Sequence, residues 1–237
     1  GHTCAILDNL TVQCWGENGD GQVGDGTTTE RTTPVYVSLG GSLVAVSERD
    51  LDIDGTLNIF DTHMKRTSPI IAGGNQHTCA VLDNVSLYCW GANDYGQIGD
   101  GTTTKRYTPV AVSLPSGRTA ASVSTAWFHT CAALDDGSAY CWGYNNYGQL
   151  GDGTTTSSTT PVAVSLPSGR TAASVSAGSH ACAVLDDASL YCWGHNGYGQ
   201  LGDGTTTQST TPVAVSLPSG RTASSVSTGN NHACAVL

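Results

Sequence analysis

The chain has 237 residues and a formal net charge of −10, with charged residues at only 12% of its positions. An acidic chain has little attraction for a phosphate backbone, so the composition argues against nucleic acid as a partner. The apolar residues recur too regularly for a disordered polar segment. No run of about 18 apolar residues occurs, so we expect no membrane span in this chain.

One sequence pattern recurs along the chain. Its copies begin at His2, His77, His129, His180 and His232, the last being cut short. The first two copies start 75 residues apart, and the later copies start 51 or 52 residues apart. Self-similarity with such a period is typical of propellers and repeat arrays. The units that we infer are 1–39, 70–121, 122–173, 174–225 and a partial unit, 226–237. Because the chain begins and ends inside a copy, we expect it to be a piece of a longer protein.

Each unit predicts short strands and no helix. Between Cys182 and Cys192, two apolar runs flank a polar turn, which is typical of a β-hairpin. A Gly-rich stretch and a Thr run follow, and then a strand such as the one in which Val162 and Val164 share a face. Residues 167–169 form a turn, and 173–177 lead into the next unit. Four strands in about 50 residues fit one blade of a β-propeller, so the predicted fold class is all-β.

The first unit carries an insertion, residues 40–69, that the other units lack. Within it, residues 50–61 place Asp at the first, third, fifth and twelfth positions and Gly at the sixth. This spacing is typical of calcium loops, because alternate oxygens converge on a hard cation and Gly permits the sharp bend. The predicted ligands are Asp50, Asp52, Asp54, Thr56, Asn58 and Asp61. The alternatives are an acidic surface turn without a metal ion and, for the whole insertion, a linker between two propellers.

Eight of the nine cysteines form pairs with nine residues between the members. The predicted disulfides are Cys4–Cys14, Cys79–Cys89, Cys131–Cys141 and Cys182–Cys192. This separation about a central turn places the two cysteines opposite each other on neighbouring antiparallel strands, within disulfide reach. Oxidised pairs indicate an extracellular protein, whereas buried reduced thiols of a cytosolic propeller are the alternative. Cys234 stands where a fifth pair would start.

Residues that recur once per unit are interpreted as structural, because catalytic groups occur once per protein. They are the histidine that opens each copy and the tryptophan of each Cys-Trp-Gly, namely Trp15, Trp90, Trp142 and Trp193. The stretch Gly-Gln-Leu-Gly-Asp-Gly lacks the Lys of a phosphate loop, so we do not expect nucleotide binding. We find no Ser/His/Asp order, no unique pair of acids and no cofactor loop, and we predict that the chain is not an enzyme.

Two further features are candidate surface sites. Sequons at Asn9 and Asn84 fall at equivalent hairpin turns, where a glycan would be tolerated. Trp127 and Phe128 stand where other units have small or polar residues, so an exposed pair there is a candidate contact site. A local filling of the core is the alternative for these two aromatic residues.

The repeated pattern H-x-C-A-x-L-D-x-x-x-x-Y-C-W-G-x-N-x-Y-G-Q-L-G-D-G-T resembles the regulator of chromosome condensation (alpha-tubulin suppressor-like) repeat, a family of propeller blades. The resemblance covers nearly all of the chain outside the insertion. It implies that the units belong to a larger ring, which in this family usually has seven blades. It also suggests nucleotide exchange on a small GTPase, as in the founding member. The insertion separately resembles thrombospondin type 3 and EF-hand-like calcium loops.

Together these features predict a secreted or cell-surface propeller that binds a protein or a glycan through its loops. A structural subunit of an extracellular surface layer, filament or appendage, which would assemble with itself, is the alternative from a different class. The paired cysteines, the calcium-type loop and the acidic charge argue against a cytosolic or nuclear exchange factor.

Overall fold

The structure is a computed structural model and describes residues 1–7, 11–39, 70–82 and 86–237. Within these ranges the regular secondary structure is β-strand, which confirms the predicted all-β class. The same ranges hold no helix with the length and apolar character needed to cross a membrane. The predicted calcium residues of 50–61 and the predicted glycosylation sites Asn9 and Asn84 lie outside the described residues.

The described strands form five antiparallel sheets. The first contains β1 (His2–Ile6), β2 (Val12–Gly16) and β3 (Arg31–Tyr36). The second contains β4 (Ile70–Gly73), β5 (His77–Val81), β6 (Leu87–Gly91) and β7 (Arg106–Ala111). The third contains β8 (Ala120–Thr125), β9 (His129–Leu134), β10 (Ala139–Gly143) and β11 (Ser158–Ala163). The fourth contains β12 (Ala172–Ala177), β13 (His180–Leu185), β14 (Leu190–Gly194) and β15 (Ser209–Ala214), and the fifth β16 (Ser225–Thr228) and β17 (Ala233–Val236).

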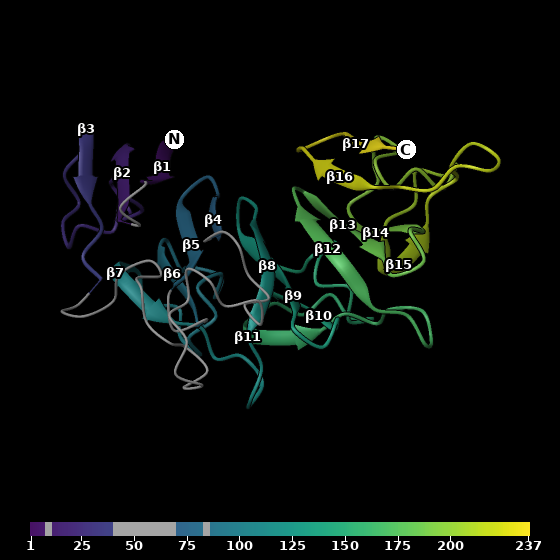
Figure 1. Ribbon diagram of the computed structural model, residues 1–237, viewed down its shortest axis with the longest axis horizontal. Helices are drawn as coiled ribbons and strands as arrows, with labels where there is room; N and C mark the ends of the chain where they lie inside the picture. Colours follow the sequence, from purple (N-terminus) through teal and green to yellow (C-terminus); the bar gives the residue numbers. More distant parts are fainter. Residues whose placement is uncertain (8–10, 40–69, 83–85) are drawn as a thin grey trace, which may run out of the picture.

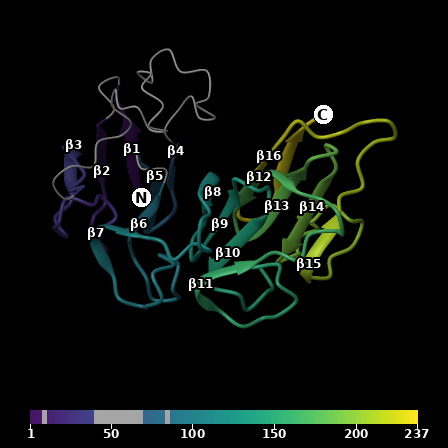
Figure 2. The same cartoon turned by 60° about the horizontal axis from the view of Figure 1, so that its bottom comes forward.

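The second, third and fourth sheets are four-stranded meanders in chain order, which is the construction of a propeller blade. Their first strands follow one another around the inside, since β4 packs near β8, β8 near β12 and β12 near β16. Figure 1 shows the sheets along an arc with the two chain ends at its tips, and Figure 2 shows the same order from another side. The described part of the chain is therefore a segment of a propeller.

The core lies between neighbouring sheets, because each blade is apolar on both faces. One buried cluster joins Cys79, Cys89 and Ile98 of the second blade to Val123 and Trp142 of the third. The blades before and after repeat this arrangement, with the disulfide of one blade packed in the same cluster as the tryptophan of the next. The alternation of a strand thus points the cysteine toward the following blade and the adjacent tryptophan toward the preceding one.

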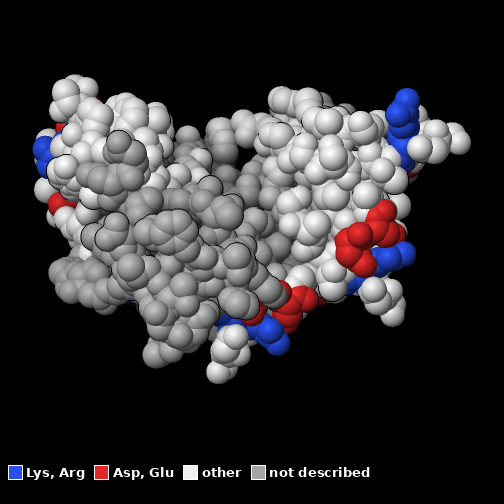
Figure 3. All heavy atoms as spheres, viewed as in Figure 1, with Lys and Arg blue, Asp and Glu red and all other residues white. Residues whose placement is uncertain are grey.

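Antiparallel order assigns the connections to two opposite faces of the propeller. We use the name loop face for the face that carries the turns between the first and second strands and the long connections between the third and fourth strands. In the third blade these are residues 126–128 and 144–157. The opposite face carries the turn at 135–138 and the connection at 164–171. Ion pairs join such turns to the connections that precede their blades: Arg118 lies 3.0 Å from Asp136, and Arg170 lies 2.8 Å from Asp187. Acidic and basic atoms also lie side by side in small groups in Figure 3.

Candidate binding surface on the loop face

A buried asparagine holds each long connection of the loop face in shape. Asn145 has no exposed surface, and its Nδ2 donates to the carbonyl oxygens of Thr154 (3.2 Å) and Thr156 (3.0 Å). Its Oδ1 accepts from the backbone N–H of Leu150 at 2.9 Å. Asn18, Asn93 and Asn196 make the same set of contacts in their own units. One side chain thus replaces the backbone pairing that an irregular loop lacks.

Replacing Asn145 with Ala should lower the free energy of unfolding by about 3 kcal/mol, because two carbonyl groups and one N–H would lose their buried partner. Asn146 is the matched control: it is the next residue and its side chain is exposed. Asn146→Ala should change the free energy of unfolding by less than about 0.5 kcal/mol. Urea denaturation of both variants measures the difference, and equal stabilities would contradict the assigned role.

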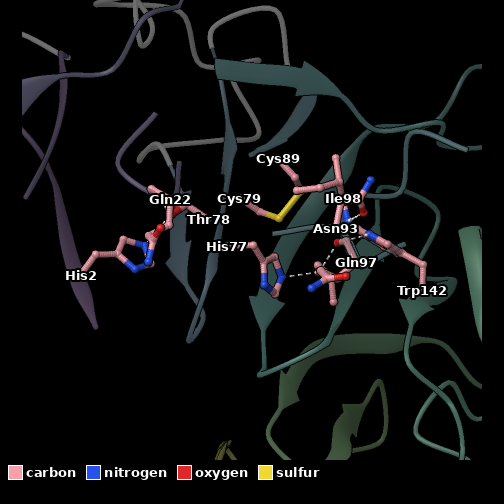
Figure 4. The surroundings of a disulfide bond; sticks show 11 residues. His2, Gln22, His77, Thr78, Cys79, Cys89, Asn93, Gln97, Ile98 and Trp142 are labelled. Atoms are coloured by element: carbon pink, nitrogen blue, oxygen red, sulfur yellow. Dashed lines mark hydrogen bonds between the residues drawn. A yellow bond between two sulfur atoms is a disulfide. The ribbon is translucent and has the colours of Figure 1, made fainter. Parts of the chain in front are cut away.

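The tryptophan of each blade locks that blade to the loop of the preceding one. Trp142 is fully buried and its Nε1 donates to the carbonyl oxygen of Gln97 at 2.9 Å (Figure 4). Trp90 and Trp193 donate in the same way to Gln22 and Gln149. The Gly-rich loop serves this contact, because a Cβ on Gly99 would lie 2.6 Å from Trp142 Nε1 and the φ of +79° also favours glycine. The predicted structural role of these tryptophans is confirmed at the buried positions, while Trp15 is half-buried.

His2 and His77, which open the first two copies, form hydrogen bonds to the next blade. His77 Nε2 lies 2.8 Å from Thr130 Oγ1 of the next blade, and this hydroxyl donates to the carbonyl oxygen of Gln97 at 2.8 Å. Because the hydroxyl hydrogen is committed to Gln97, His77 must donate from Nε2 and leave Nδ1 unprotonated. Burial lowers the pKa of His77 to about 3, with a smaller contribution from the neighbouring His129. His77 is therefore a neutral packing group, in agreement with the structural role predicted from its repetition, but its hydrogen bond joins two blades instead of lying within one.

The four predicted cysteine pairs are all joined. In each hairpin the two cysteines stand directly opposite each other in the strand register, as Cys131 does to Cys141. Their Cα atoms lie 4.0 to 4.1 Å apart. Cys234 is exposed and has no disulfide among the described residues.

Trp127 and Phe128 lie in the short turn that leads from β8 to β9, and Trp127 is 49% exposed. The Phe128 ring lies 5.1 Å from Tyr95 of the second blade and 6.2 Å from Tyr144 of its own blade, measured between centroids. The two residues predicted as a contact candidate are therefore part of a larger aromatic group on the loop face.

This aromatic belt crosses three blades without a break. Its members are Tyr95, Trp127, Phe128, Tyr144, Tyr147, His195 and Tyr198. Successive centroids along it are 4.9 to 6.3 Å apart, with tilted or edge-on geometry that is favourable for aromatic pairs. Tyr95, Tyr147 and Tyr198 are 41%, 42% and 71% exposed, so the belt presents ring surface to solvent.

The loop scaffold fixes the position of each exposed tyrosine. The backbone N–H of Tyr147 donates to Gln149 Oε1 at 2.8 Å, and Tyr95 and Tyr198 have the same contact with Gln97 and Gln200. These tyrosines were not among the contact residues predicted from the sequence. The sequence does contain an indication of them. A tyrosine stands two residues before the glutamine in three units, whereas an aspartate, Asp20, stands there in the first.

A cleft lies beside β17 at the C-terminal edge of the described sheets. Its lining includes Gln200, Leu201, Val226 and Cys234. Gln200 is the counterpart of Gln97 and Gln149, whose carbonyl groups accept from a tryptophan of the following blade. The lining is therefore that of a contact between blades.

Among the described residues there is also no group of three or more His, Cys, Asp or Glu that could hold a metal ion.

Family models match most of the chain. The regulator of chromosome condensation (RCC1) repeat matches residues 86–133, 136–185 and 187–236, and a second RCC1 repeat model matches 70–97, 120–149 and 173–200. The chain is 30% identical over 236 residues to the ultraviolet-B receptor UVR8 of Arabidopsis thaliana. It is 27% identical over 266 residues to the E3 ubiquitin-protein ligase HERC2 of Homo sapiens. Each alignment covers 99% of this chain, but only 48% of the receptor and 6% of the ligase.

Solved structures show the same fold. The chain is similar to human WBSCR16, with a TM-score of 0.79 and 20% identity over 99% of this chain and 55% of that chain. It is similar to yeast RCC1 (Prp20) bound to Kap60, with a TM-score of 0.76 and 19% identity over 99% of this chain and 52% of that chain. From its repeats, its four-stranded blades and these matches, the chain belongs to the regulator of chromosome condensation (RCC1) repeat family of β-propellers.

Proposed function

We propose that this propeller is a binding module rather than an enzyme, and that it recognises a protein or a glycan partner through its loop face. The observation that carries the proposal is the aromatic belt. Exposed tyrosine and tryptophan rings on a rigid scaffold supply contact area at low cost in conformational entropy, and they are enriched at interaction sites. The relatives that align with 99% of this chain include a receptor, which supports a role in recognition.

The same proposal places the protein outside the cell or at its surface. The support is the oxidation of a cysteine pair in each of four hairpins, since disulfides persist in oxidising compartments and are rare in the cytosol. Alkylation of the protein after denaturation without a reductant tests the location, because denaturation makes buried thiols accessible and leaves disulfides intact. Only Cys234 should react if the protein is extracellular, whereas labelling of all nine cysteines would contradict this location.

We further propose that the insertion binds calcium, on the basis of its sequence between Asp50 and Asp61. Calorimetric titration of the chain with calcium should show one site. Asp54→Ala should abolish this binding, because it removes a ligand carboxylate, and unchanged binding in the variant would contradict the proposal.

Site-specific photocrosslinking tests the binding face. A photoreactive phenylalanine derivative at Tyr198 should form covalent adducts with another macromolecule in the native environment. The same group at the exposed Ser168, on the opposite face, should not. Adducts from both positions or from neither would contradict a loop-face site. Adducts between copies of this chain would favour the structural role in a self-assembled layer or filament.

A further inference from the structure

The loop face has a second property besides its aromatic belt, which is an excess of carboxylates. The long connections of the loop face are residues 17–30, 92–105, 144–157 and 195–208. Together with the first residues of β3 and β7, they contain eight acidic residues and three Lys or Arg residues. The acidic residues are Glu17, Asp20, Asp25, Glu30, Asp94, Asp100, Asp152 and Asp203. The basic residues are Arg31, Lys105 and Arg106.

All three basic residues are already engaged. Arg31 pairs with Asp25, Lys105 with Asp20 and Arg106 with Asp100, each at 2.5 Å. These ion pairs belong to the first two blades. The basic charge of the loop face is thus neutralised within the face and is not offered to a partner.

The third and fourth blades lack these ion pairs on the loop face. Ser158 and Ser209 stand where the first two blades have Arg31 and Arg106. Asp152 and Asp203 keep the contacts to threonine and asparagine side chains that their counterparts make. No Lys or Arg occurs in the connections 144–157 and 195–208. Asp152 and Asp203 are therefore not paired with a basic residue of their own connection, and they lie on the two blades that contain most of the belt.

The carboxylates and the rings belong to the same connections of the loop face. Asn145 follows Tyr144 in the chain, and its side chain lies 3.4 Å from Asp152. Asn196 follows His195 and lies 3.4 Å from Asp203. The exposed residue Asp94 immediately precedes Tyr95. Each blade of the belt therefore combines ring faces with a carboxylate, and the face of an aromatic ring is itself the negative end of a quadrupole.

We propose that the belt docks a basic segment of a partner protein, with arginine or lysine side chains over the exposed rings and their charge opposite Asp94, Asp152 and Asp203. This inference rests on the proposed binding function and names its surface and partner chemistry. Arginine fits best, because its planar guanidinium stacks on aromatic rings and also pairs with carboxylates. A neutral glycan would leave the carboxylates uncompensated. A second copy of this chain would bring another net charge of −10 against the same acidic face.

Fluorescence titration tests the docking directly, because Trp127 lies in the belt and is exposed while Trp90, Trp142 and Trp193 are buried. The probe is a synthetic peptide of alternating arginine and glycine, and its control is the same peptide with citrulline, a neutral analogue, at each arginine. The arginine peptide should change the emission of Trp127 and bind saturably. The citrulline peptide should bind at least tenfold more weakly, on the order expected for the loss of cation–π and ionic contacts.

Two belt variants separate docking on the rings from general attraction to an acidic protein. Tyr147→Ala and Tyr198→Ala leave the charge unchanged and should each weaken the peptide about tenfold. Tyr36→Ala is the matched control, because Tyr36 is 62% exposed on β3 and lies outside the belt. Calorimetry on the same variants provides a readout that does not depend on tryptophan.

Equal affinity for the arginine and citrulline peptides would overturn the proposal, as would equal weakening by Tyr36→Ala and Tyr147→Ala. Binding of a neutral oligosaccharide or of a proline-rich peptide in place of the arginine peptide would assign the belt to another occupant. These results would leave the binding function standing if photocrosslinks still form at Tyr198. Absence of both peptide binding and crosslinks would overturn the function itself.

Discussion

Reduction of the disulfides should unfold the propeller segment at room temperature. Each bridge closes a short hairpin loop and should stabilise the fold by about 2–3 kcal/mol on the chain-entropy model. Four such contributions together approach the whole stability of an ordinary domain. Circular dichroism with increasing reductant should therefore show loss of the strand signal, and an unchanged spectrum after complete reduction would contradict this role.

Removal of a single disulfide measures how much one bridge contributes to the free energy of unfolding. The double variant Cys131→Ser, Cys141→Ser should lose about 2–3 kcal/mol of unfolding free energy or more, because both positions are fully buried in the core between two blades. Cys234→Ser is the control, since that thiol is exposed and free among the described residues. Urea denaturation under oxidising conditions measures both, and a similar loss in the control would exclude the disulfide as the cause.

Acidification from pH 7.5 to pH 5 should also destabilise the fold strongly. Burial lowers the pKa of His77 and His129 to about 3 and the pKa of His2 and His180 to about 4. In the unfolded chain these groups titrate near 6.5, so the unfolded state binds more protons between about pH 6.5 and pH 3. Stability is therefore complete above pH 6.5 and is lost as the pH falls through this window.

The expected size is roughly 2 kcal/mol at pH 5 for each of His77 and His129. The physical cause is specific: protonation of His77 would add an N–H at Nδ1, which is buried without a partner among the described residues. Urea denaturation at pH 7.5 and pH 5 measures the loss. His129→Leu should reduce the dependence on pH, because it removes one of the titrating groups, and an unchanged dependence would contradict the assignment.

The carboxylates change the stability of the fold at a lower pH than the histidines, so they do not obscure this test. Hydrogen bonds to Ser138 lower the pKa of Asp136 below its usual value of 3.8, and those to Ser189 do the same for Asp187. Their contribution is present above pH 3.8 and is lost only below it. The decline between pH 6.5 and pH 5 therefore reports on the histidines.

Much of the fold followed from the spacing of residues along the chain. The ten-residue separation of Cys131 and Cys141 about a polar turn determines that they face each other in a hairpin, because the register of antiparallel strands is set by the turn. The period of about 50 residues determines the blades, and residues such as Trp142 that occur once per period have to pack between them. These conclusions depend on local geometry and repetition, which a sequence displays directly.

The binding surface depends on how neighbouring blades pack against each other. Tyr95 and Tyr147 are 52 positions apart in the sequence. They belong to one belt only because Trp142 and Thr130 bind the carbonyl group of Gln97 and thereby set the third blade against the loop of the second. The sequence by itself determined the blades, the disulfides and the buried histidines. Only the tertiary structure decided which loops lie side by side, because packing between blades is a long-range interaction that the period of a repeat does not specify.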